Sequence, residues 1–329
     1  MTKKEIIAEI GSVHDGSLGN AMKLIDCASD CGAHTVKFQL HISSEEMVNS
    51  AKNPPYFKSE SRKLYFDRIQ FTENQLQKII EYCRKKKINF LCSPFSVKAL
   101  EILEKINVNS YKIASGEVSN TYLLKKIANT NKRVYLSTGM SNYEDIDRAV
   151  KIFKKNNLVI MQCTSQYPCH ERKVGLNNIK IFKEKYKCKI GFSDHYEGSA
   201  AGFAAAALGA SVIEKHITFS KLMYGSDAQF AMEPNDFKNY VKGIKNIWLM
   251  NESPVDKNDV EFLKDMKRIF EKSIYTAKDL KKNSILKISD ISFKKPGTGI
   301  KAFKYKLILG KKIKRDLKID HKINFSDLE

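Results

Sequence analysis

One segment of the chain reads Ser211-Val212-Ile213-Glu214-Lys215-His216-Ile217-Thr218. Its β-branched beginning predicts a buried strand, and strand alternation then places Glu214 and His216 on one face and Lys215 on the other. Shortly upstream, residues 189–195 have the same design, because a short apolar run there ends in serine, aspartate and histidine. Two consecutive strands that end in titratable side chains are therefore expected.

The same alternation of a strand and a helix extends through most of the chain. Strand-like runs occupy residues 5–10, 35–40, 89–93, 110–114, 133–137, 158–163, 189–193 and 211–216. Segments with helical periodicity follow at residues 18–31, 73–87, 97–106, 120–129, 143–155, 176–186, 198–208 and 235–249. Eight such units fit a closed (β/α)8 TIM barrel better than a doubly wound sheet, and no Gly-x-Gly-x-x-Gly follows the first strand. Residues 41–70 are expected to form a long loop.

The pattern changes after the eighth unit. We expect a barrel domain over residues 1–250 and a linker over 251–271, with a helical stretch from Val260 to Phe270 as an alternative for part of the linker. The remaining residues, 272–329, have short strand-like runs and a turn signal at 295–299. They predict a small, mostly-β domain that is short for independent stability.

Composition narrows the function classes. The chain has 57 Lys and Arg against 37 Asp and Glu, a formal charge of +20. These basic residues are scattered and lack interleaved aromatics, so we do not expect nucleic-acid binding. Seven cysteines without a paired framework indicate neither a disulfide scaffold nor a zinc ribbon. Because Met1–Lys4 lead straight into a strand and no long apolar run follows, we expect a soluble cytoplasmic protein without a membrane partner.

In a barrel of this kind, the chemistry lies at the carboxyl ends of the strands. The sequence places polar side chains there on every strand, namely Glu9, Lys37, Gln39, Ser93, Lys112, Ser115, Glu117, Ser137, Thr138, Thr164, Ser165, Tyr167, Ser193, Asp194, His195, Glu214 and His216. Two lysines and many hydroxyls suit a dianionic phosphate. A single Lys or Ser is more often a solvated loop residue. The prediction of a phosphate site therefore depends on the repeated occurrence of such residues at the ends of several strands.

His195 and His216 lie on adjacent predicted strands, whose axes are about 4.8 Å apart. Two imidazoles with water or substrate oxygens can form an open divalent-metal site. The alternative, that each histidine is a hydrogen-bonded core residue or a base, stays open. Lys215 faces away and is left out of the catalytic set. The acidic candidates for proton handling or for orienting a metal-bound water are Glu9, Glu117, Glu214 and Asp227.

Taken together, these motifs resemble the sialic acid synthase family. The matching segments are Ile7-Ala8-Glu9-Ile10-Gly11, His14-Asp15-Gly16, Val36-Lys37-Phe38-Gln39, Ser93-Pro94-Phe95, Tyr111-Lys112-Ile113-Ala114-Ser115-Gly116-Glu117, Leu136-Ser137-Thr138-Gly139-Met140, Cys163-Thr164-Ser165, Tyr167-Pro168, Gly191-Phe192-Ser193-Asp194-His195 and Glu214-Lys215-His216. Residues 277–282 and 294–299 resemble the family's C-terminal antifreeze-like (SAF) domain. The resemblance covers essentially the whole chain in order.

The resemblance implies a condensation of phosphoenolpyruvate with an N-acetylated amino hexose, which gives a nine-carbon 2-keto acid and phosphate. It implies a Mn²⁺ or Mg²⁺ ion on His195 and His216, and a homodimer in which each SAF domain caps the partner's barrel. Sugar contacts are implied for Gln39, Asp227 and Lys295, and acidic roles near the reacting carbons for Glu9, Glu117 and Asp227. The implied phosphoenolpyruvate contacts are Lys37, Ser93, Lys112, Ser115, Ser137, Tyr167 and Ser193.

Three positions depart from the family pattern. Val13 stands where Asn is usual, Gln162 where His often precedes Cys-Thr, and Lys295 where Arg is usual. Lysine cannot reproduce the arginine fork, so the acceptor, N-acetylmannosamine or a 2,4-diacetamido-2,4,6-trideoxyhexose, is left open. Two alternatives also remain. One is a Schiff-base aldolase or other synthase on the same barrel, and the other is a carbohydrate- or nucleic-acid-binding protein with an inactive barrel.

Overall fold

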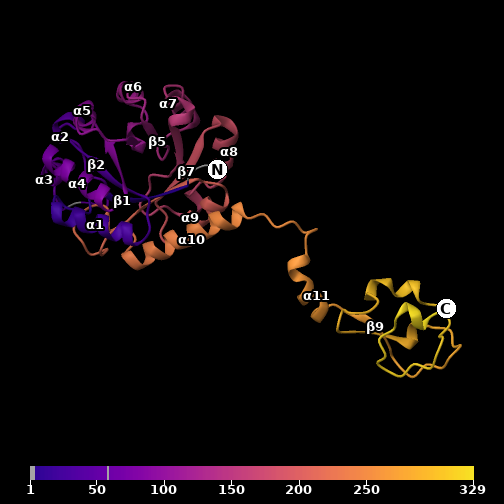
Figure 1. The fold of residues 1–329 in the computed structure, drawn as a ribbon. Helices are drawn as coiled ribbons and strands as arrows, with labels where there is room; N and C mark the ends of the chain where they lie inside the picture. Colours follow the sequence, from indigo (N-terminus) through magenta and orange to yellow (C-terminus); the bar gives the residue numbers. More distant parts are fainter. Residues whose placement is uncertain (1–3, 58) are drawn as a thin grey trace. The chain divides into compact units, whose positions relative to one another are not determined.

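The computed structural model of the protein describes residues 4–57 and 59–329. The expected lead-in at Met1–Lys3 and Lys58 of the predicted loop lie outside the described residues. The chain divides into two compact units, and the boundary falls between Ser253 and Pro254 (Figure 1).

The first unit is a closed barrel of eight parallel strands, in which each strand pairs with the next and β8 pairs with β1. The strands are β1 (Glu5–Gly11), β2 (Thr35–Leu40), β3 (Asn89–Pro94), β4 (Ser110–Ile113), β5 (Arg133–Ser137), β6 (Leu158–Gln162), β7 (Lys189–Asp194) and β8 (Val212–His216). The predicted (β/α)8 fold is confirmed, and every expected strand is present within two residues of its expected bounds.

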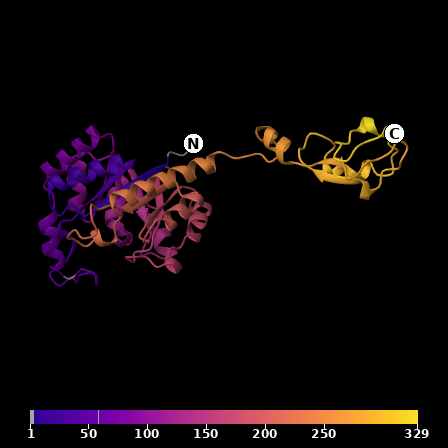
Figure 2. The same cartoon turned by 90° about the horizontal axis from the view of Figure 1, so that it is seen from below.

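Helices cover the outside of the barrel (Figure 2). They are α1 (Leu18–Asp30), α4 (Glu73–Lys85), α5 (Val97–Lys105), α6 (Thr121–Asn129), α7 (Tyr143–Val150), α8 (Asn177–Tyr186), α9 (Ala200–Ala207) and α10 (Pro234–Glu252). Side-chain capping fixes where several of these helices begin. Thr72 at the start of α4 and Asn142 at the start of α7 each form a capping box with the residue three positions later in the sequence. Pro234 stands at the first turn of α10, where its missing N–H costs nothing.

The segment between β2 and α4, expected as a continuous loop, contains two short helices, α2 (Ser43–Glu46) and α3 (Arg62–Ile69). The loop prediction was therefore wrong for these residues. The Ser61 side chain caps α3, which buries Tyr65, Phe66 and Ile69. A helix of eight residues with a weak apolar pattern is too short to be recognised from its periodicity. The burial of its three large side chains in the tertiary structure stabilises this helix instead.

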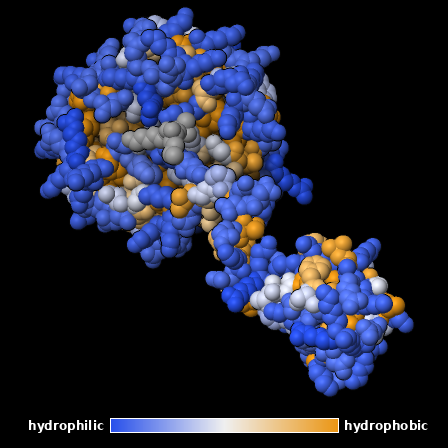
Figure 3. All heavy atoms as spheres, turned by 45° about the vertical axis from the view of Figure 1, so that its right-hand side comes forward, coloured by the Kyte–Doolittle hydropathy of each residue, from blue (hydrophilic) through white to orange (hydrophobic). Residues whose placement is uncertain are grey.

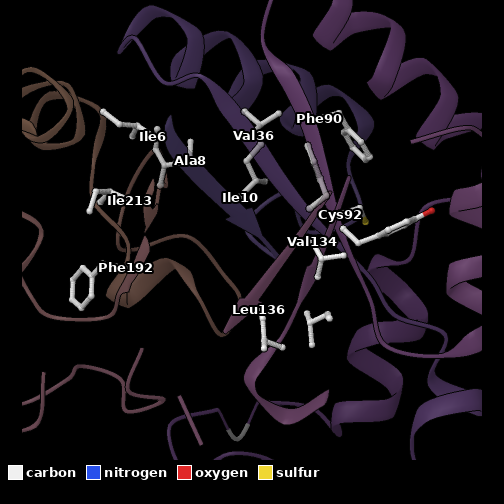
Figure 4. Packing of buried hydrophobic residues seen from close by; sticks show 14 of the residues in the cluster. Ile6, Ala8, Ile10, Val36, Phe90, Cys92, Val134, Leu136, Phe192 and Ile213 are labelled. Atoms are coloured by element: carbon white, nitrogen blue, oxygen red, sulfur yellow. The ribbon is translucent and has the colours of Figure 1, made fainter. Parts of the chain in front are cut away.

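Alternate residues of each strand face opposite sides of the barrel wall. Residues such as Ile6, Ala8, Val36 and Ile213 point outward into a core shared with the helices (Figure 4). A second, smaller apolar cluster comes from the inward-facing positions, namely Ile7, Leu91, Tyr135, Val159, Met161 and Val212. Above this layer, toward the carboxyl ends of the strands, the inward-facing side chains are polar.

Lys215 faces outward, as alternation predicts. Its ammonium lies 3.2 Å from Asp194 Oδ2, and the Tyr240 hydroxyl donates to the same carboxylate oxygen at 2.7 Å. Asp194 and Lys215 each precede one of the paired histidines in the sequence, so this buried contact joins β7 and β8 to α10 behind the two rings.

The second unit contains the antiparallel pair β9 (Ser273–Thr276) and β10 (Ile291–Lys294), which confirms a small, mostly-β fold. The expected linker contains the 3-10 helix Glu261–Leu263 and the helix α11 (Lys264–Phe270). The core of the second unit is formed by Ile274, Leu280, Leu286, Ile291, Ile300, Ile308, Ile313, Leu317, Ile323 and Leu328.

Hydrophilic residues dominate the surface of both units in the view of Figure 3, as expected from the abundance of lysine. Over residues 4–57 and 59–329, no helix has the length and apolar character needed to cross a membrane.

The packing of α9 against α10 leads to a stability prediction. A Cβ atom added at Gly202 would lie 2.0 Å from the Tyr240 hydroxyl, which is buried and held by Asp194. We expect Gly202→Ala to destabilise the barrel by about 1–3 kcal/mol through overpacking. Gly19→Ala in α1 is the matched control, because its Cβ would meet only Ser17 Oγ at 3.7 Å; it should be neutral or stabilising by up to about 1 kcal/mol.

Urea unfolding followed by the fluorescence of Trp248, the single tryptophan, reports on the barrel because its indole N–H donates to Ala210 O. Equal stability of the Gly202→Ala and Gly19→Ala variants would contradict this account of the α9–α10 contact.

Candidate active site

The Glu214 carboxylate lies at the centre of the polar layer inside the barrel. Lys112 Nζ contacts both of its oxygens, at 2.6 and 2.7 Å, and Lys37 Nζ contacts Oε1 at 3.0 Å. The Ser193 hydroxyl also donates to Oε1, at 2.9 Å. These four side chains come from β8, β4, β2 and β7, so strands from opposite sides of the barrel converge on one carboxylate.

Burial and pairing set the charge states of this group. Burial favours the neutral form of Glu214, but the two ammonium groups outweigh it and hold the pKa of this carboxyl well below its usual range. Burial likewise opposes charge on Lys37, yet attraction to Glu214 and Glu9 raises the pKa of Lys37 above its ordinary value. At Lys112 burial prevails over the attraction to Glu214, and the pKa is lowered to about 8.

Glu9 lies beside this group at the end of β1. Its Oε1 accepts a hydrogen bond from Gln39 Nε2 at 2.6 Å, and its Oε2 lies 3.4 Å from Lys37 Nζ without a hydrogen-bond partner among the described residues. Burial raises the pKa of Glu9 to about 7, although Lys37 acts against it. A carboxyl with this pKa can both accept and donate a proton near neutral pH.

The two histidines predicted as metal ligands are brought together. The ring centroids of His195 and His216 are 5.9 Å apart, and the Tyr167 ring centroid lies 4.1 Å from that of His195. His195 Nδ1 contacts Thr164 O at 2.9 Å, and its Nε2 contacts the Tyr167 hydroxyl at 2.9 Å. Burial lowers the pKa of His216 to about 4, so this ring is neutral, and its Nδ1 is buried without a hydrogen-bond partner among the described residues.

Asp227 joins the site from the segment after β8. Its Oδ2 accepts hydrogen bonds from the backbone N–H and the hydroxyl of Ser12, at 2.9 and 2.8 Å. Burial favours the protonated form, but His216 and these donors lower the pKa of Asp227. Gly11 makes the approach possible, because it adopts φ +53° at a bulge of β1 and a Cβ there would lie 2.3 Å from Oδ2.

Besides Ser193, the serines predicted to contact phosphoenolpyruvate lie at three further strand ends. Ser93 is buried on β3, and its hydroxyl has no partner among the described residues. Ser137 is buried at the end of β5. The Ser115 hydroxyl, just after β4, accepts a hydrogen bond from the Gly139 N–H at 3.0 Å.

Two further predicted residues, Glu117 and Lys295, make contacts away from the group around Glu214. Glu117 lies on the same rim of the barrel, where its carboxylate accepts a hydrogen bond from Asn120 at 2.9 Å. Lys295 belongs to the second unit, and its ammonium lies 4.9 Å from the centroid of the Phe270 ring.

The departures at positions 13 and 162 lie away from the polar layer. Val13 is fully buried in the core between strands and helices. The Gln162 amide donates to Val174 O at 3.0 Å, and its oxygen accepts from Asn178.

Sequence reasoning missed several residues near the site. His41 and Glu46 extend the hydrogen bonds of Gln39, and alternation along Lys37, Gln39 and His41 could have revealed the histidine. The Tyr56, Tyr167 and Phe230 rings form an aromatic cluster, with Tyr56 5.2 Å from Phe230 and 5.9 Å from Tyr167. No sequence signal connects Tyr56 to Phe230, because they lie on loops far apart in the chain.

Comparisons with known proteins agree along the whole chain. The profile of the NeuB family matches residues 24–268, and that of the SAF domain matches residues 271–329. N,N'-diacetyllegionaminic acid synthase of Campylobacter jejuni is 35% identical over 98% of this chain and 99% of its own length. Pseudaminic acid synthase of the same species is 31% identical over 98% of this chain and 96% of its length.

Among solved structures, the N-acetylneuraminic acid synthetase of Leptospira borgpetersenii, in complex with citrate, matches with a TM-score of 0.71 and 31% identity, over 81% of this chain and 93% of that one. The predicted resemblance to sialic acid synthases is thereby confirmed. With its eight-stranded barrel and C-terminal SAF domain, the chain belongs to the NeuB family.

Proposed function

We propose that the protein condenses phosphoenolpyruvate with an N-acetylated amino hexose, which yields a sialic-acid-like nonulosonic acid and free phosphate. The observation that carries this proposal is the pair of buried lysines, Lys37 and Lys112, held at the strand ends by one shared carboxylate. Relatives whose names are legionaminic, pseudaminic and neuraminic acid synthases support the reaction class.

The phosphoenolpyruvate end of the site is built on strands. Each ammonium group has N–H donors beyond those it directs at Glu214. The Ser93 hydroxyl, which has no partner within residues 4–57 and 59–329, adds a short donor. We assign Lys37, Ser93, Lys112, Ser115, Ser137, Tyr167 and Ser193 to phosphoenolpyruvate. Since strands hold most of these groups in a closed barrel, little side-chain conformational freedom has to be lost on binding.

The residues present fit a divalent cation, although the described residues contain no group of three or more His, Cys, Asp or Glu suited to one. Contact of His195 Nδ1 with the Thr164 carbonyl leaves a lone pair on Nε2, which the Tyr167 hydroxyl contacts, and neutral His216 has a nitrogen without a hydrogen-bond partner among the described residues. The lysine–glutamate group carries a net charge near +1, which is too little to balance phosphoenolpyruvate. We propose that His195 and His216 hold Mn²⁺ or Mg²⁺, which would act as a Lewis acid toward the acceptor aldehyde.

The remaining acidic groups handle protons and orient the acceptor. Glu9 can donate a proton to the aldehyde oxygen as C3 of phosphoenolpyruvate attacks the aldehyde carbon, because its pKa is near 7. Water then adds at C2, and phosphate leaves by C–O cleavage. Asp227 stays ionised and accepts hydrogen bonds from sugar hydroxyls. Glu214 holds the lysines in place, and Glu117 remains a candidate at the rim.

The acceptor end is built on loops. Gln39 and Asp227 supply polar contacts there, and the aromatic cluster of Tyr56, Tyr167 and Phe230 supplies an apolar wall. We propose that Lys295 of a partner subunit completes this end in a homodimer with exchanged SAF domains. We place the protein in the cytoplasm, which the free cysteines support.

The proposed reaction predicts phosphate release that depends on an acceptor and on metal. Purified protein with Mn²⁺ and phosphoenolpyruvate should release phosphate on addition of N-acetylmannosamine or a 2,4-diacetamido-2,4,6-trideoxyhexose, and EDTA should abolish the release. Release that persists in EDTA, together with a lysine adduct trapped by borohydride, would favour a Schiff-base aldolase. No release with any acceptor would contradict the proposed function.

The lowered pKa of Lys112 predicts a pH dependence of phosphoenolpyruvate binding. As pH rises through about 8, Lys112 loses its proton and the site loses one positive charge. The KM for phosphoenolpyruvate should therefore rise above pH 8. In Lys112→Met, KM should be about 10–100-fold higher at neutral pH and should not rise further across pH 8. A wild-type KM that is constant from pH 7 to 9.5 would contradict this role of Lys112.

A further inference from the structure

A line of hydrogen bonds leads from Glu9 to a buried pair outside the barrel lumen. Beyond Gln39, whose Nε2 donates to Glu9 at 2.6 Å, Gln39 Oε1 lies 3.0 Å from His41 Nε2. His41 Nδ1 in turn lies 2.8 Å from Glu46 Oε2. The imidazole is stacked between Phe66 and Phe95, with ring centroids 3.8 and 3.9 Å away. The reaction proposed above assigns no role to His41 or Glu46.

Counting hydrogens along this line fixes the state of His41. The Gln39 NH2 group faces Glu9, so the Gln39 oxygen, which can only accept, faces His41 Nε2. With the amide in this orientation, Nε2 must carry a hydrogen. Nδ1 faces a carboxylate oxygen, so one further proton lies between Nδ1 and Glu46. The buried pair thus holds two protons, whichever of its two members holds the second.

A flip of the Gln39 amide is the competing arrangement. It would place the Gln39 oxygen against Glu9, which requires a protonated Glu9, and the NH2 group against Nε2, which requires an Nε2 without a hydrogen. Other titratable groups act electrostatically on this line: Lys37 and Glu214 act on Glu9, and Glu117 and His14 lie near enough to interact with Glu46 and His41.

We propose that His41 and Glu46 are positioning residues that fix the Gln39 amide with its NH2 group on Glu9. This inference rests on the proposed function of the site. Because the amide occupies Glu9 Oε1, the oxygen left for the substrate proton is Oε2, which accepts no hydrogen bond from the part of the chain that the structure describes. Phe66 and Phe95 pack on the two faces of the imidazole and restrict its rotation, so the ring keeps its nitrogens directed at Gln39 and Glu46.

His41→Phe tests the proposal, because it keeps an aromatic ring between Phe66 and Phe95 and removes both ring nitrogens. We expect kcat to fall about 10–100-fold, as for other groups that orient a catalytic residue, with the KM for phosphoenolpyruvate within about twofold of wild type. Gln39→Ala should have a similar effect. The double variant should be no worse than Gln39→Ala alone, because His41 acts through Gln39. Additive losses, or an unchanged kcat in His41→Phe, would overturn the proposal.

Glu46 offers a conservative variant. In Glu46→Gln the new amide can donate to His41 Nδ1, which leaves the hydrogen on Nε2, so kcat should stay within about threefold of wild type. Glu46→Leu has no donor or acceptor and should lose activity as His41→Phe does. Tyr186→Phe is the matched control, because it removes a hydrogen bond from α8 to Asp147 of α7 and should leave kcat unchanged. Equal activity of Glu46→Gln and Glu46→Leu would contradict the role of Glu46.

A measurement without turnover separates this proposal from the proposed function. The ¹⁵N spectrum of histidine-labelled protein at neutral pH should contain a protonated Nε2 signal that is absent from His41→Phe, which assigns it to His41. An unprotonated Nε2 would overturn the proposal even if the enzyme is active. A protonated Nε2 in a protein that releases no phosphate with any acceptor would support the hydrogen-bond line while the proposed function failed.

Discussion

The burial of one carboxylate between two ammonium groups is the constraint on which the polar half of the barrel depends. Charged groups inside a protein are costly unless each one is paired. The Glu214 carboxylate on β8 pairs with both Lys37 on β2 and Lys112 on β4. The Ser193 hydroxyl on β7 donates a further hydrogen bond to it. Barrel closure is what brings these four strands to one point, so fold and charge pairing support each other.

The two ends of the site differ in how they are built. The end proposed to bind phosphoenolpyruvate stands on β-strands above an apolar layer of inward-facing residues such as Ile7, Leu91 and Val212. The proposed acceptor end uses loops and short helices, with Tyr56, Phe230 and Asp227 coming from segments after β2 and β8. Loops can change without disturbing the barrel, so one common chemistry can be combined with different amino sugars.

The sequence allowed much of this arrangement to be predicted. Strand and helix periodicity gave all eight units, and alternation correctly separated Lys215 from Glu214 and His216. Periodicity could not predict which polar side chains pair with each other inside the barrel. These contacts cross the lumen and depend on the stagger of the strands in the closed sheet.

The same limit explains what was missed. Glu214 was expected near the histidines, and the structure uses it to hold two lysines. His41 lies beyond the end of β2, and its partner Glu46 lies in α2, a four-residue helix without a detectable pattern. Lys295 belongs to a separate unit, where no local pattern relates it to the barrel.

A crystal structure of the protein with phosphoenolpyruvate tests the central claim most directly. The account predicts phosphate oxygens about 2.7–3.2 Å from Lys37 Nζ or Lys112 Nζ and from the Ser93 hydroxyl, with Glu214 still between the lysines. Phosphoenolpyruvate bound at the opposite end of the barrel, or with its phosphate away from both lysines, would contradict it.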